Sequence, residues 1–289
     1  MIFSLITDNK GNLYCERGLQ MKKLLAILFS LLLSFSTIVS ASVSNAPIHW
    51  GFKKSSNEEP VEAGKEYDEL LEKYGAFYKG DPKKKDIFLT FDNGYENGYT
   101  AKVLDVLKKE KVPAAFFITG HYLESASDLV KRMADEGHIV GNHSYYHPDM
   151  TTVGDERFYR ELEKVRAGTE EITGVKHMVY LRPPRGVFSE RTLMKAKEMG
   201  YTHVFWSLAF VDWYRDDQKG WQYSYNNVMK QIHPGAVLLL HTVSKDNADA
   251  LETIIKDLKK KGYTFKSLDE YTRGEAMKDP IFKIRKRNK

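Results

Sequence analysis

From residue 86 onward, the sequence alternates between short apolar runs and longer segments with helical spacing. The expected strands are 87–91, 114–118, 139–140, 179–181, 202–207, 236–240 and 264–267, and the expected helices are 100–109, 128–135, 155–173, 189–199, 225–232 and 247–260. The strands are apolar on both faces, which is typical of a parallel sheet covered by helices. Seven such units predict an α/β fold of the closed or distorted (β/α) barrel kind. An open doubly wound sheet is the alternative.

The segment 21–41 has the pattern of a secretory signal peptide. It begins with two lysines, continues with about ten nearly unbroken apolar residues and ends in small residues. The alternative is a transmembrane anchor, but the run is shorter than the roughly 20 apolar residues that a spanning helix needs. Residues 1–20 precede this basic start, so we interpret them as an upstream leader and Met21 as the true start. We therefore expect an exported protein, secreted or held in the cell wall.

Composition bounds the remaining parts of the chain. At 289 residues and 42% hydrophobic content, the chain can bury a full core. The only cysteine, Cys15, lies in the leader, so the exported chain would have no disulfide and no sulfur metal ligand. Within residues 42–85, the stretch IHWGFKKSSNEEPVEAG shows no regular period and one short amphipathic piece lies around Tyr67 to Tyr74. We interpret residues 42–85 as an N-terminal arm packed on a domain that spans 86–272. Residues 273–289 are interpreted as a basic tail.

The charge of the chain is concentrated at its C-terminal end. The formal net charge is +5, and five positive residues stand close together there: Lys283, Arg285, Lys286, Arg287 and Lys289. The rest of the chain is therefore close to neutral, which argues against a nucleic-acid partner. The tail is a candidate contact for anionic wall polymer or for a membrane surface, and the alternative is a solvated tail. We expect a monomer.

Polar residues end five of the predicted strand regions. The five stretches are TFDNG (90–94), HSYYH (143–147), RPPRG (182–186), VDW (211–213) and LHT (240–242). The active site of a parallel barrel lies at the carboxyl ends of its strands. We therefore expect the five stretches to meet at one rim.

Two of these stretches contain candidate metal ligands. His143 and His147 are four residues apart, which would place both imidazoles on one face of a helical turn and suits a divalent metal. Ordinary surface or hydrogen-bonded histidines are the alternative. Gly94 would let the chain turn so that Asp92 and Asn93 share the rim, although an Asx turn that ends the strand explains the pair equally well.

The other stretches contain candidate acid–base residues. His241 follows an apolar strand, so its imidazole is a candidate acid or base, and Asp212 offers it a carboxylate partner. Arg182 precedes two prolines that stiffen the backbone, which favours a fixed guanidinium beside an acid. The alternatives are a core histidine and ordinary surface salt bridges.

Taken together, the five stretches resemble the motifs of the polysaccharide deacetylases, carbohydrate esterases of family 4 with a NodB-like domain, over roughly residues 85–270. Within that family, the chain looks most like the muramic acid de-N-acetylases that lead to δ-lactam in the spore cortex. That likeness rests on LTFDNGYENGYT, GNHSYYHPD, YLRPPRGVFSE, FWSLAFVDW and LLLHTVSKDNA. The resemblance implies metal-dependent de-N-acetylation of N-acetylmuramic acid in peptidoglycan glycan strands. The alternatives are an N-acetylglucosamine deacetylase of peptidoglycan or chitin, an O-acetyl esterase, and a metal-free wall-glycan binding protein.

The resemblance also implies a role for each matching residue. Asp92 would be the general base and Arg182 would orient it. His241 would be the general acid and Asp212 would tune it. The metal ligands would be His143 and His147, and we expect the amide oxygen of Asn93 to be the third ligand. Trp213 would line the acetyl pocket. We also expect Arg185, Gly186 and Tyr146 to contact the substrate.

The chemistry needs the metal more than the base. A carboxylate with a pKa of about 3.9 facing bulk water is mismatched by about 12 pKa units, or roughly 16 kcal/mol. A metal that brings the pKa of its water to about 7 reduces this mismatch to roughly 4 kcal/mol, which a positioned base can overcome.

Two positions depart from the family pattern. Asn93 stands where the family usually has a second aspartate ligand, and an amide lacks the negative charge that attracts a cation. We therefore expect weaker and less selective binding, with Zn²⁺ favoured by the two imidazoles and Mn²⁺, Mg²⁺ or Ca²⁺ tolerated. Arg185 stands where many relatives have an aromatic residue. Its guanidinium would suit the lactyl carboxylate of peptide-free muramic acid, which N-acetylglucosamine lacks. An ordinary surface arginine is the alternative.

Overall fold

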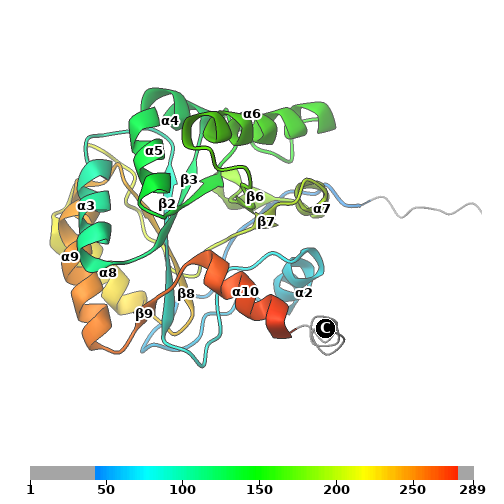
Figure 1. Ribbon diagram of the computed structural model, residues 1–289. Helices are drawn as coiled ribbons and strands as arrows, with labels where there is room; N and C mark the ends of the chain where they lie inside the picture. The colour runs from blue at the N-terminus through cyan, green and yellow to red at the C-terminus, as the bar shows by residue number, and fades with distance from the viewer. Residues whose placement is uncertain (1–42, 279–289) are drawn as a thin grey trace, which may run out of the picture. The chain divides into compact units, whose positions relative to one another are not determined.

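The computed structural model describes residues 43–278 (Figure 1). The leader and signal peptide predicted for residues 1–41 lie outside the described residues, as do residues 279–289 of the predicted tail. Between residues 43 and 278, no helix is both long and apolar enough to cross a membrane.

The described residues alternate between strands and helices, as the periodicity predicts. The strands are β1 (Ile48–His49), β2 (Asp86–Asn93), β3 (Ala114–Ile118), β4 (Ile139–Asn142), β5 (Tyr180–Leu181), β6 (Val187–Phe188), β7 (Thr202–His203), β8 (Ala236–His241) and β9 (Thr264–Phe265). The helices are α2 (Lys65–Tyr74), α3 (Thr100–Glu110), α4 (Gly120–Ser125), α5 (Ser127–Asp135), α6 (Asp155–Thr173), α7 (Glu190–Glu198), α8 (Trp221–Gln231), α9 (Lys245–Lys260) and α10 (Leu268–Lys278), with a 3₁₀ turn at Pro184–Gly186.

The main sheet is parallel, with the strand order β7-β5-β4-β3-β2-β8 and with β9 paired to the first residues of β2. This confirms the predicted α/β fold, in the form of a curled, partly closed barrel. β7 and β8 stand at the two ends of the strand order. Part of the N-terminal arm connects them, because Phe77 bridges to Val204 beyond β7 and Lys79 bridges to Ala236 in β8. The arm therefore contributes to the sheet as well as packing on it.

Strand β2 determines which side chains reach the interior of the barrel. Its residues are buried from Ile87 to Asn93, and successive side chains point to opposite faces. Ile87, Leu89 and Phe91 belong to the main hydrophobic core. Helices α3, α9 and α8 lie together on one side of β2 and β8 (Figure 1). Thr90 and Asp92 occupy the opposite face, which is the inner face of the curled sheet.

Several element boundaries differ from the predicted ones. Helix α9 begins at Lys245 rather than at residue 247, because the Ser244 hydroxyl accepts a hydrogen bond from the backbone N–H of Asn247 at 3.2 Å and caps the helix. Helix α4 was not predicted, and the side chain of Thr119 caps it in the same way. Helix α10 continues past residue 272, where the sequence placed the start of the tail.

Candidate active site

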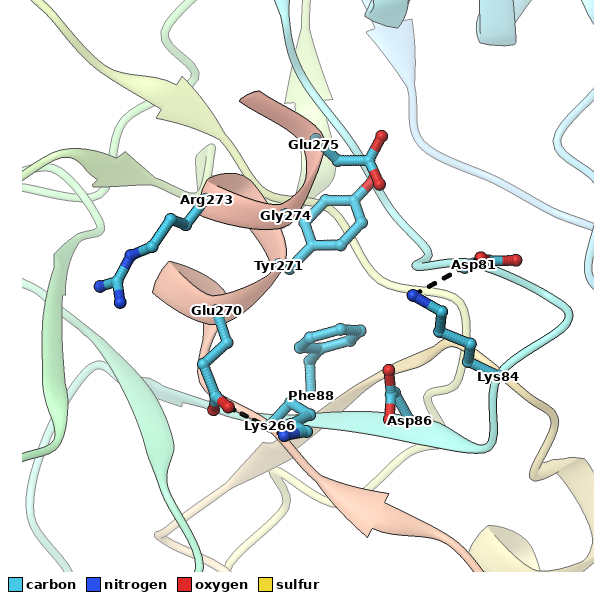
Figure 2. Close-up of a pocket in the computed structure, with 10 residues that line it drawn as sticks. All are labelled: Asp81, Lys84, Asp86, Phe88, Lys266, Glu270, Tyr271, Arg273, Gly274 and Glu275. Atoms are coloured by element: carbon cyan, nitrogen blue, oxygen red, sulfur yellow. Dashed lines mark hydrogen bonds and ion pairs between the residues drawn. The ribbon is translucent and has the colours of Figure 1, made fainter. Parts of the chain in front are cut away.

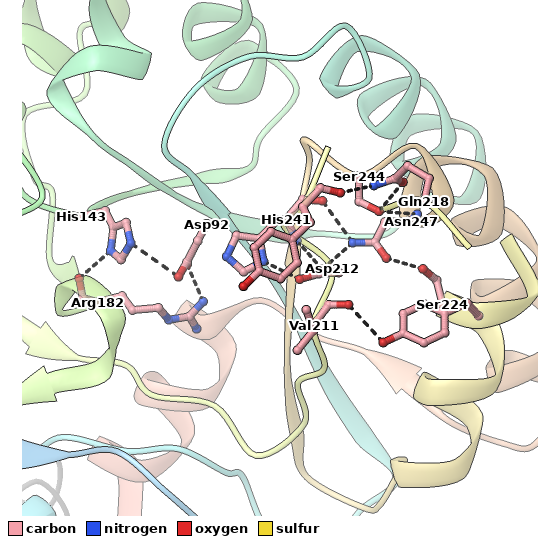
Figure 3. Close-up of polar contacts among 12 residues, drawn as sticks. Asp92, His143, Arg182, Val211, Asp212, Gln218, Ser224, His241, Ser244 and Asn247 are labelled. Carbon is pink, nitrogen blue, oxygen red and sulfur yellow. Dashed lines mark hydrogen bonds and ion pairs between the residues drawn. The ribbon is translucent and has the colours of Figure 1, made fainter. Parts of the chain in front are cut away.

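Asp92 lies at the carboxyl end of β2 and is held by a buried arginine (Figure 3). Arg182 Nη1 donates to Asp92 Oδ1 at 2.8 Å. The same guanidinium donates through Nη2 to Thr90 Oγ1 at 2.9 Å and through Nε to the Val204 carbonyl at 3.0 Å. Arg182 is 0% exposed, and its guanidinium carbon lies 4.2 Å from the centre of the Phe117 ring. The arginine is therefore immobilised, and it fixes the orientation of the carboxylate.

The charges around Asp92 keep it ionised. Burial of the carboxylate opposes ionisation, but the positive charge of Arg182, to which Asp92 is hydrogen-bonded, outweighs this effect. The pKa of Asp92 consequently lies below its ordinary value. At neutral pH this residue is a carboxylate with one oxygen bound by Arg182 and the other available as a base.

His143 presents a lone pair toward the same carboxylate. Its Nδ1 lies 2.8 Å from the carbonyl oxygen of Arg182. A carbonyl only accepts hydrogen bonds, so Nδ1 carries the proton and Nε2 keeps its lone pair. That Nε2 stands 3.6 Å from Asp92 Oδ2. Burial lowers the pKa of His143 despite the attraction of Asp92, so the ring is neutral and suited to ligation.

His147 meets His143, but not through the helical turn that the spacing predicted. The ring centroids are 4.8 Å apart, while residues 143–147 form an irregular loop. The helical prediction fails because Ser144 and His147 adopt left-handed backbone angles, with φ of 62° and 55°. The side chain of Asn142 accepts the Ser144 N–H at 2.9 Å, and Pro148 disfavours a helical His147. Burial, followed by repulsion from His143, lowers the pKa of His147 to about 3, so this ring is also neutral.

Asn93 contributes a buried oxygen that lacks a hydrogen bond. Asn93 is 0% exposed, and its Nδ2 donates to Thr242 Oγ1 at 2.7 Å. Its Oδ1 is buried with no hydrogen-bond partner among the described residues. Leaving such a group unpaired costs about 1–3 kcal/mol, a cost that a bound cation would remove.

The donor set of this region suits a divalent cation only if the amide takes part. Within the part of the chain that the structure describes, no group of three or more His, Cys, Asp or Glu side chains is arranged to hold a metal. Two neutral imidazoles together with the unpaired oxygen of Asn93 would supply three neutral ligands. These residues therefore fit the metal that the sequence predicts.

His241 occupies the other side of Asp92. The two residues are register partners at the ends of β8 and β2. His241 Nδ1 donates to Asp212 Oδ1 at 2.7 Å, and the backbone N–H of His241 donates to Asp212 Oδ2 at 2.9 Å. Burial disfavours the protonated ring, but the charge and hydrogen bond of Asp212 outweigh it, so the pKa of His241 is raised. With 21% of its side chain exposed, His241 can give a proton to a bound molecule.

Sequence reasoning missed two residues that orient Asp212. Asn247 Nδ2 donates to Asp212 Oδ2 at 2.5 Å, and Ser224 Oγ donates to Asn247 Oδ1 at 2.7 Å (Figure 3). Asn247 lies in the first turn of α9 and Ser224 lies in α8. The only sequence signal for them was the likeness of LLLHTVSKDNA to the family, which includes Asn247.

Three of the predicted substrate contacts are exposed. The ring centroid of Trp213 lies 5.5 Å from that of His241, and Trp213 is 43% exposed. Tyr146 is 66% exposed. Arg185 is exposed in the 3₁₀ turn with a left-handed φ of 58°. Such a backbone is uncommon for arginine and is often found where a side chain is held for a function.

The fourth predicted contact, Gly186, is buried. Its φ is 69°, and a Cβ atom there would lie 2.8 Å from the Trp206 ring and 3.0 Å from Trp50. The backbone N–H of Trp50 also donates to the Gly186 carbonyl at 2.9 Å. Packing and backbone conformation thus explain the glycine, and a contact with substrate stays a prediction.

Cavities occur at both ends of β2. One of about 470 Å³ adjoins the candidate site and is lined by Gly94, Tyr95, Thr119, His121, Glu124, Tyr145, Tyr146 and His147. Another, of about 360 Å³, lies between α10 and Asp86 at the amino end of β2 (Figure 2). It contains the ion pair of Lys266 with Glu270 at 2.9 Å. Of these two cavities, only the first is lined by candidate site residues, His147 and Tyr146.

Comparison with known proteins gives concordant matches. The polysaccharide deacetylase family model matches residues 79–204. The peptidoglycan-N-acetylmuramic acid deacetylase PdaA of Bacillus subtilis is 55% identical over 251 residues, which cover 87% of this chain and 95% of that protein. An uncharacterized 30.6 kDa protein of Geobacillus stearothermophilus is 62% identical over 251 residues, with the same coverage of 87% and 95%.

The fold agrees with these sequence matches. The solved structure of Bacillus subtilis PdaA, a family 4 carbohydrate esterase, superposes with a TM-score of 0.79 at 57% identity and covers 81% of this chain and 100% of that one. Likeness at this level extends over nearly the whole length of the relatives. The chain therefore belongs to the polysaccharide deacetylase family.

Proposed function

We propose that this chain removes the N-acetyl group from N-acetylmuramic acid in peptidoglycan glycan strands, and that the reaction needs a divalent cation. The observation that carries the proposal is the arrangement around Asp92. The Asp92 carboxylate lies between His241, whose pKa is raised by Asp212, and His143, whose Nε2 stands 3.6 Å from Asp92 Oδ2. The choice of sugar is supported by the similarity to PdaA, a peptidoglycan-N-acetylmuramic acid deacetylase, over 95% of that protein.

The proposed ligands are Asn93 Oδ1, His143 Nε2 and the ring of His147. When bound, the cation would lower the pKa of a water molecule and polarise the acetyl carbonyl. Imidazole ligands favour Zn²⁺, while an amide oxygen also suits Mn²⁺, Mg²⁺ or Ca²⁺.

The residues of the chain then divide the proton transfers between them. Asp92 uses the oxygen that Arg182 leaves free to accept a proton from the attacking water. His241, protonated through its pairing with Asp212, donates the Nε2 proton to the leaving amine nitrogen. Trp213 stands beside His241 as an apolar wall for the acetyl methyl group.

Arg185 supports the choice of muramic acid over glucosamine. Its positive charge is one of the smaller contributions to the lowered pKa of His147, which supports a position close to the proposed cation ligands. A guanidinium there can pair with the lactyl carboxylate of a peptide-free muramoyl residue. After deacetylation, the freed amine and that carboxyl group can condense with loss of water to form the δ-lactam of spore cortex. In this proposal the protein acts outside the cytoplasmic membrane, after removal of its signal peptide.

The deciding experiment uses residues 42–289 with peptide-free glycan strands and Zn²⁺. We expect mass spectrometry to show loss of acetyl groups, followed by loss of water where lactam closes. Chitooligosaccharide is the matched substrate without a lactyl group, and faster acetyl loss from it would favour an N-acetylglucosamine deacetylase. Binding to the strands without any acetyl loss, with or without chelator, would instead indicate a glycan-binding protein.

A further inference from the structure

A chain of hydroxyl groups connects Asn93 with the carboxylate of Glu96. Asn93 Nδ2 lies 2.7 Å from Thr242 Oγ1, and the hydroxyl oxygens of Thr242 and Thr100 are 2.9 Å apart. Thr100 Oγ1 donates to Glu96 Oε2, and the Tyr122 hydroxyl lies 3.0 Å from the same carboxylate oxygen and 3.1 Å from Thr100 Oγ1, so either oxygen can accept its proton. These residues come from the ends of β2 and β8, the first turn of α3, helix α4 and the loop after β2. Neither Glu96 nor Thr242 has a role in the chemistry described above.

The Glu96 carboxylate sets the direction in which these hydroxyl groups donate their protons. An ionised carboxylate can only accept hydrogen bonds, so Glu96 takes the single hydroxyl proton of Thr100. The Thr100 oxygen is then the acceptor for the proton of Thr242. The Thr242 oxygen is left to accept, and the group of Asn93 that can donate to it is the amide NH₂.

We propose that Glu96, acting through Thr100 and Thr242, holds the amide of Asn93 with its oxygen toward the cation site and its NH₂ turned away. Glu96 is thus a positioning residue for a cation ligand. The inference rests on the proposed function, because it concerns a ligand of the same site. With the opposite orientation, the NH₂ group would face the site, where its partial positive charge would repel a cation.

The direction of the protons along these hydroxyl groups suits an amide at position 93 better than a carboxylate. The Asn93→Asp substitution would draw the Thr242 proton toward the new carboxylate, while the Thr100 proton stays with Glu96. The hydroxyl oxygens of Thr242 and Thr100, which are 2.9 Å apart, would then have no proton between them. The Glu96→Gln substitution would reverse the chain, because its NH₂ group can donate to Thr100. In the reversed series of hydrogen bonds, each hydroxyl group donates toward position 93. This direction suits a carboxylate at position 93, but it turns an amide there so that its NH₂ group faces the cation site.

A double-mutant cycle read by Zn²⁺ binding tests this coupling. Calorimetric titration of the metal-free full chain should show that Glu96→Gln weakens Zn²⁺ binding between about tenfold and a hundredfold. In the Asn93→Asp background, the same change should cost much less or strengthen binding. Glu124→Gln is the matched charge control, because Glu124 lines the cavity that adjoins His147 and lies outside the hydroxyl chain. Its effect should stay within about threefold, because it removes a charge without changing the orientation of a ligand.

Further variants separate orientation from folding. Thr242→Ser keeps the hydroxyl and should retain Zn²⁺ affinity, whereas Thr242→Val removes it at similar volume and should behave like Glu96→Gln. Equal losses from Glu96→Gln in both backgrounds would overturn the inference, and so would an unchanged affinity. If Asn93→Ala weakens binding and Glu96→Gln does not, only the positioning role fails. If Asn93→Ala has no effect, the ligand assignment in the proposed function fails with it.

Discussion

The two sides of Asp92 differ in how completely their polar groups are paired. On the side of His241, both oxygens of Asp212 accept hydrogen bonds, and Asn247 is bound in turn by Ser224 (Figure 3). On the opposite side, the oxygen of Asn93 has no partner among the described residues, and the free nitrogen of His143 stands 3.6 Å from the carboxylate. The protein thus orients His241 through its own hydrogen bonds, while the opposite side keeps lone pairs that suit a cation.

The backbone shows the same contrast. His241 ends a regular strand, and Asn247 lies in a regular helix. His147 lies in a loop and has a left-handed backbone, as does Ser144 in the same loop. Left-handed conformations of non-glycine residues cost free energy and persist where the surrounding structure holds them. The side of Asp92 that contains Asn93, His143 and His147, called the cation side below, therefore combines an unpaired oxygen with backbone strain. A bound ion would stabilise both features together.

The largest expected effect comes from removing the base that both sides share. Asp92→Asn keeps the size of the side chain and a hydrogen bond to Arg182, so the protein should still fold. Acetate release should fall by about 10³-fold, within the range of general acid–base catalysis, because an amide cannot accept the proton of the attacking water. Acetate assays beside thermal unfolding measure this, and a variant that stays nearly as active as the wild type would remove Asp92 from the mechanism.

Removing the cation should affect the side of Asp92 that contains Asn93 and His143 and leave the pairing of His241 with Asp212 unchanged. Treatment with chelator should abolish acetate release and lower the unfolding temperature. Adding back Zn²⁺ at about a hundred times its Kd should restore about 2.7 kcal/mol to the free energy of unfolding. His143→Gln should remove this stabilisation, while His241→Gln should preserve it. An unfolding temperature that does not respond to metal would contradict the account of the cation side.

The pairing of His241 with Asp212 predicts how the activity depends on pH. The pKa of His241 is raised by Asp212, so the ring stays protonated to higher pH and activity is lost only as pH rises through that pKa. Asp212→Asn removes the charge and should move the alkaline limb of the kcat/KM profile to lower pH. Asn247→Ala should act in the same direction by a smaller amount. A lower rate with an unmoved alkaline limb would show that Asp212 does not tune His241.

The smallest expected effect concerns the choice of sugar. Arg185→Ala should reduce the preference for peptide-free muramoyl strands over chitooligosaccharide by about tenfold, the size of one charge-assisted hydrogen bond. Arg185→Lys keeps the charge without the planar fork and should retain part of the preference. Competition between the two substrates, read by mass spectrometry, provides the measurement. An unchanged ratio in Arg185→Ala would leave this arginine as a surface residue.

The sequence predicted the strands and the rim because apolar runs that stop at Asp92 and His241 are local patterns. It misjudged the loop of His143 and His147, since spacing alone does not reveal left-handed residues. The pairing of Asn247 with Asp212 joins positions 35 residues apart in the chain. Such contacts depend on how helices dock, which one-dimensional periodicity does not contain.

The most direct test of the account is a crystal structure of the protein soaked with Zn²⁺ or Mn²⁺, with anomalous scattering used to locate the ion. We expect a single strong peak bound by Asn93 Oδ1, His143 Nε2 and His147, with Asp92 still paired to Arg182 and not replaced by the ion. An ion bound elsewhere in the domain, or an empty site with the NH₂ group of Asn93 turned toward the two imidazoles, would contradict it.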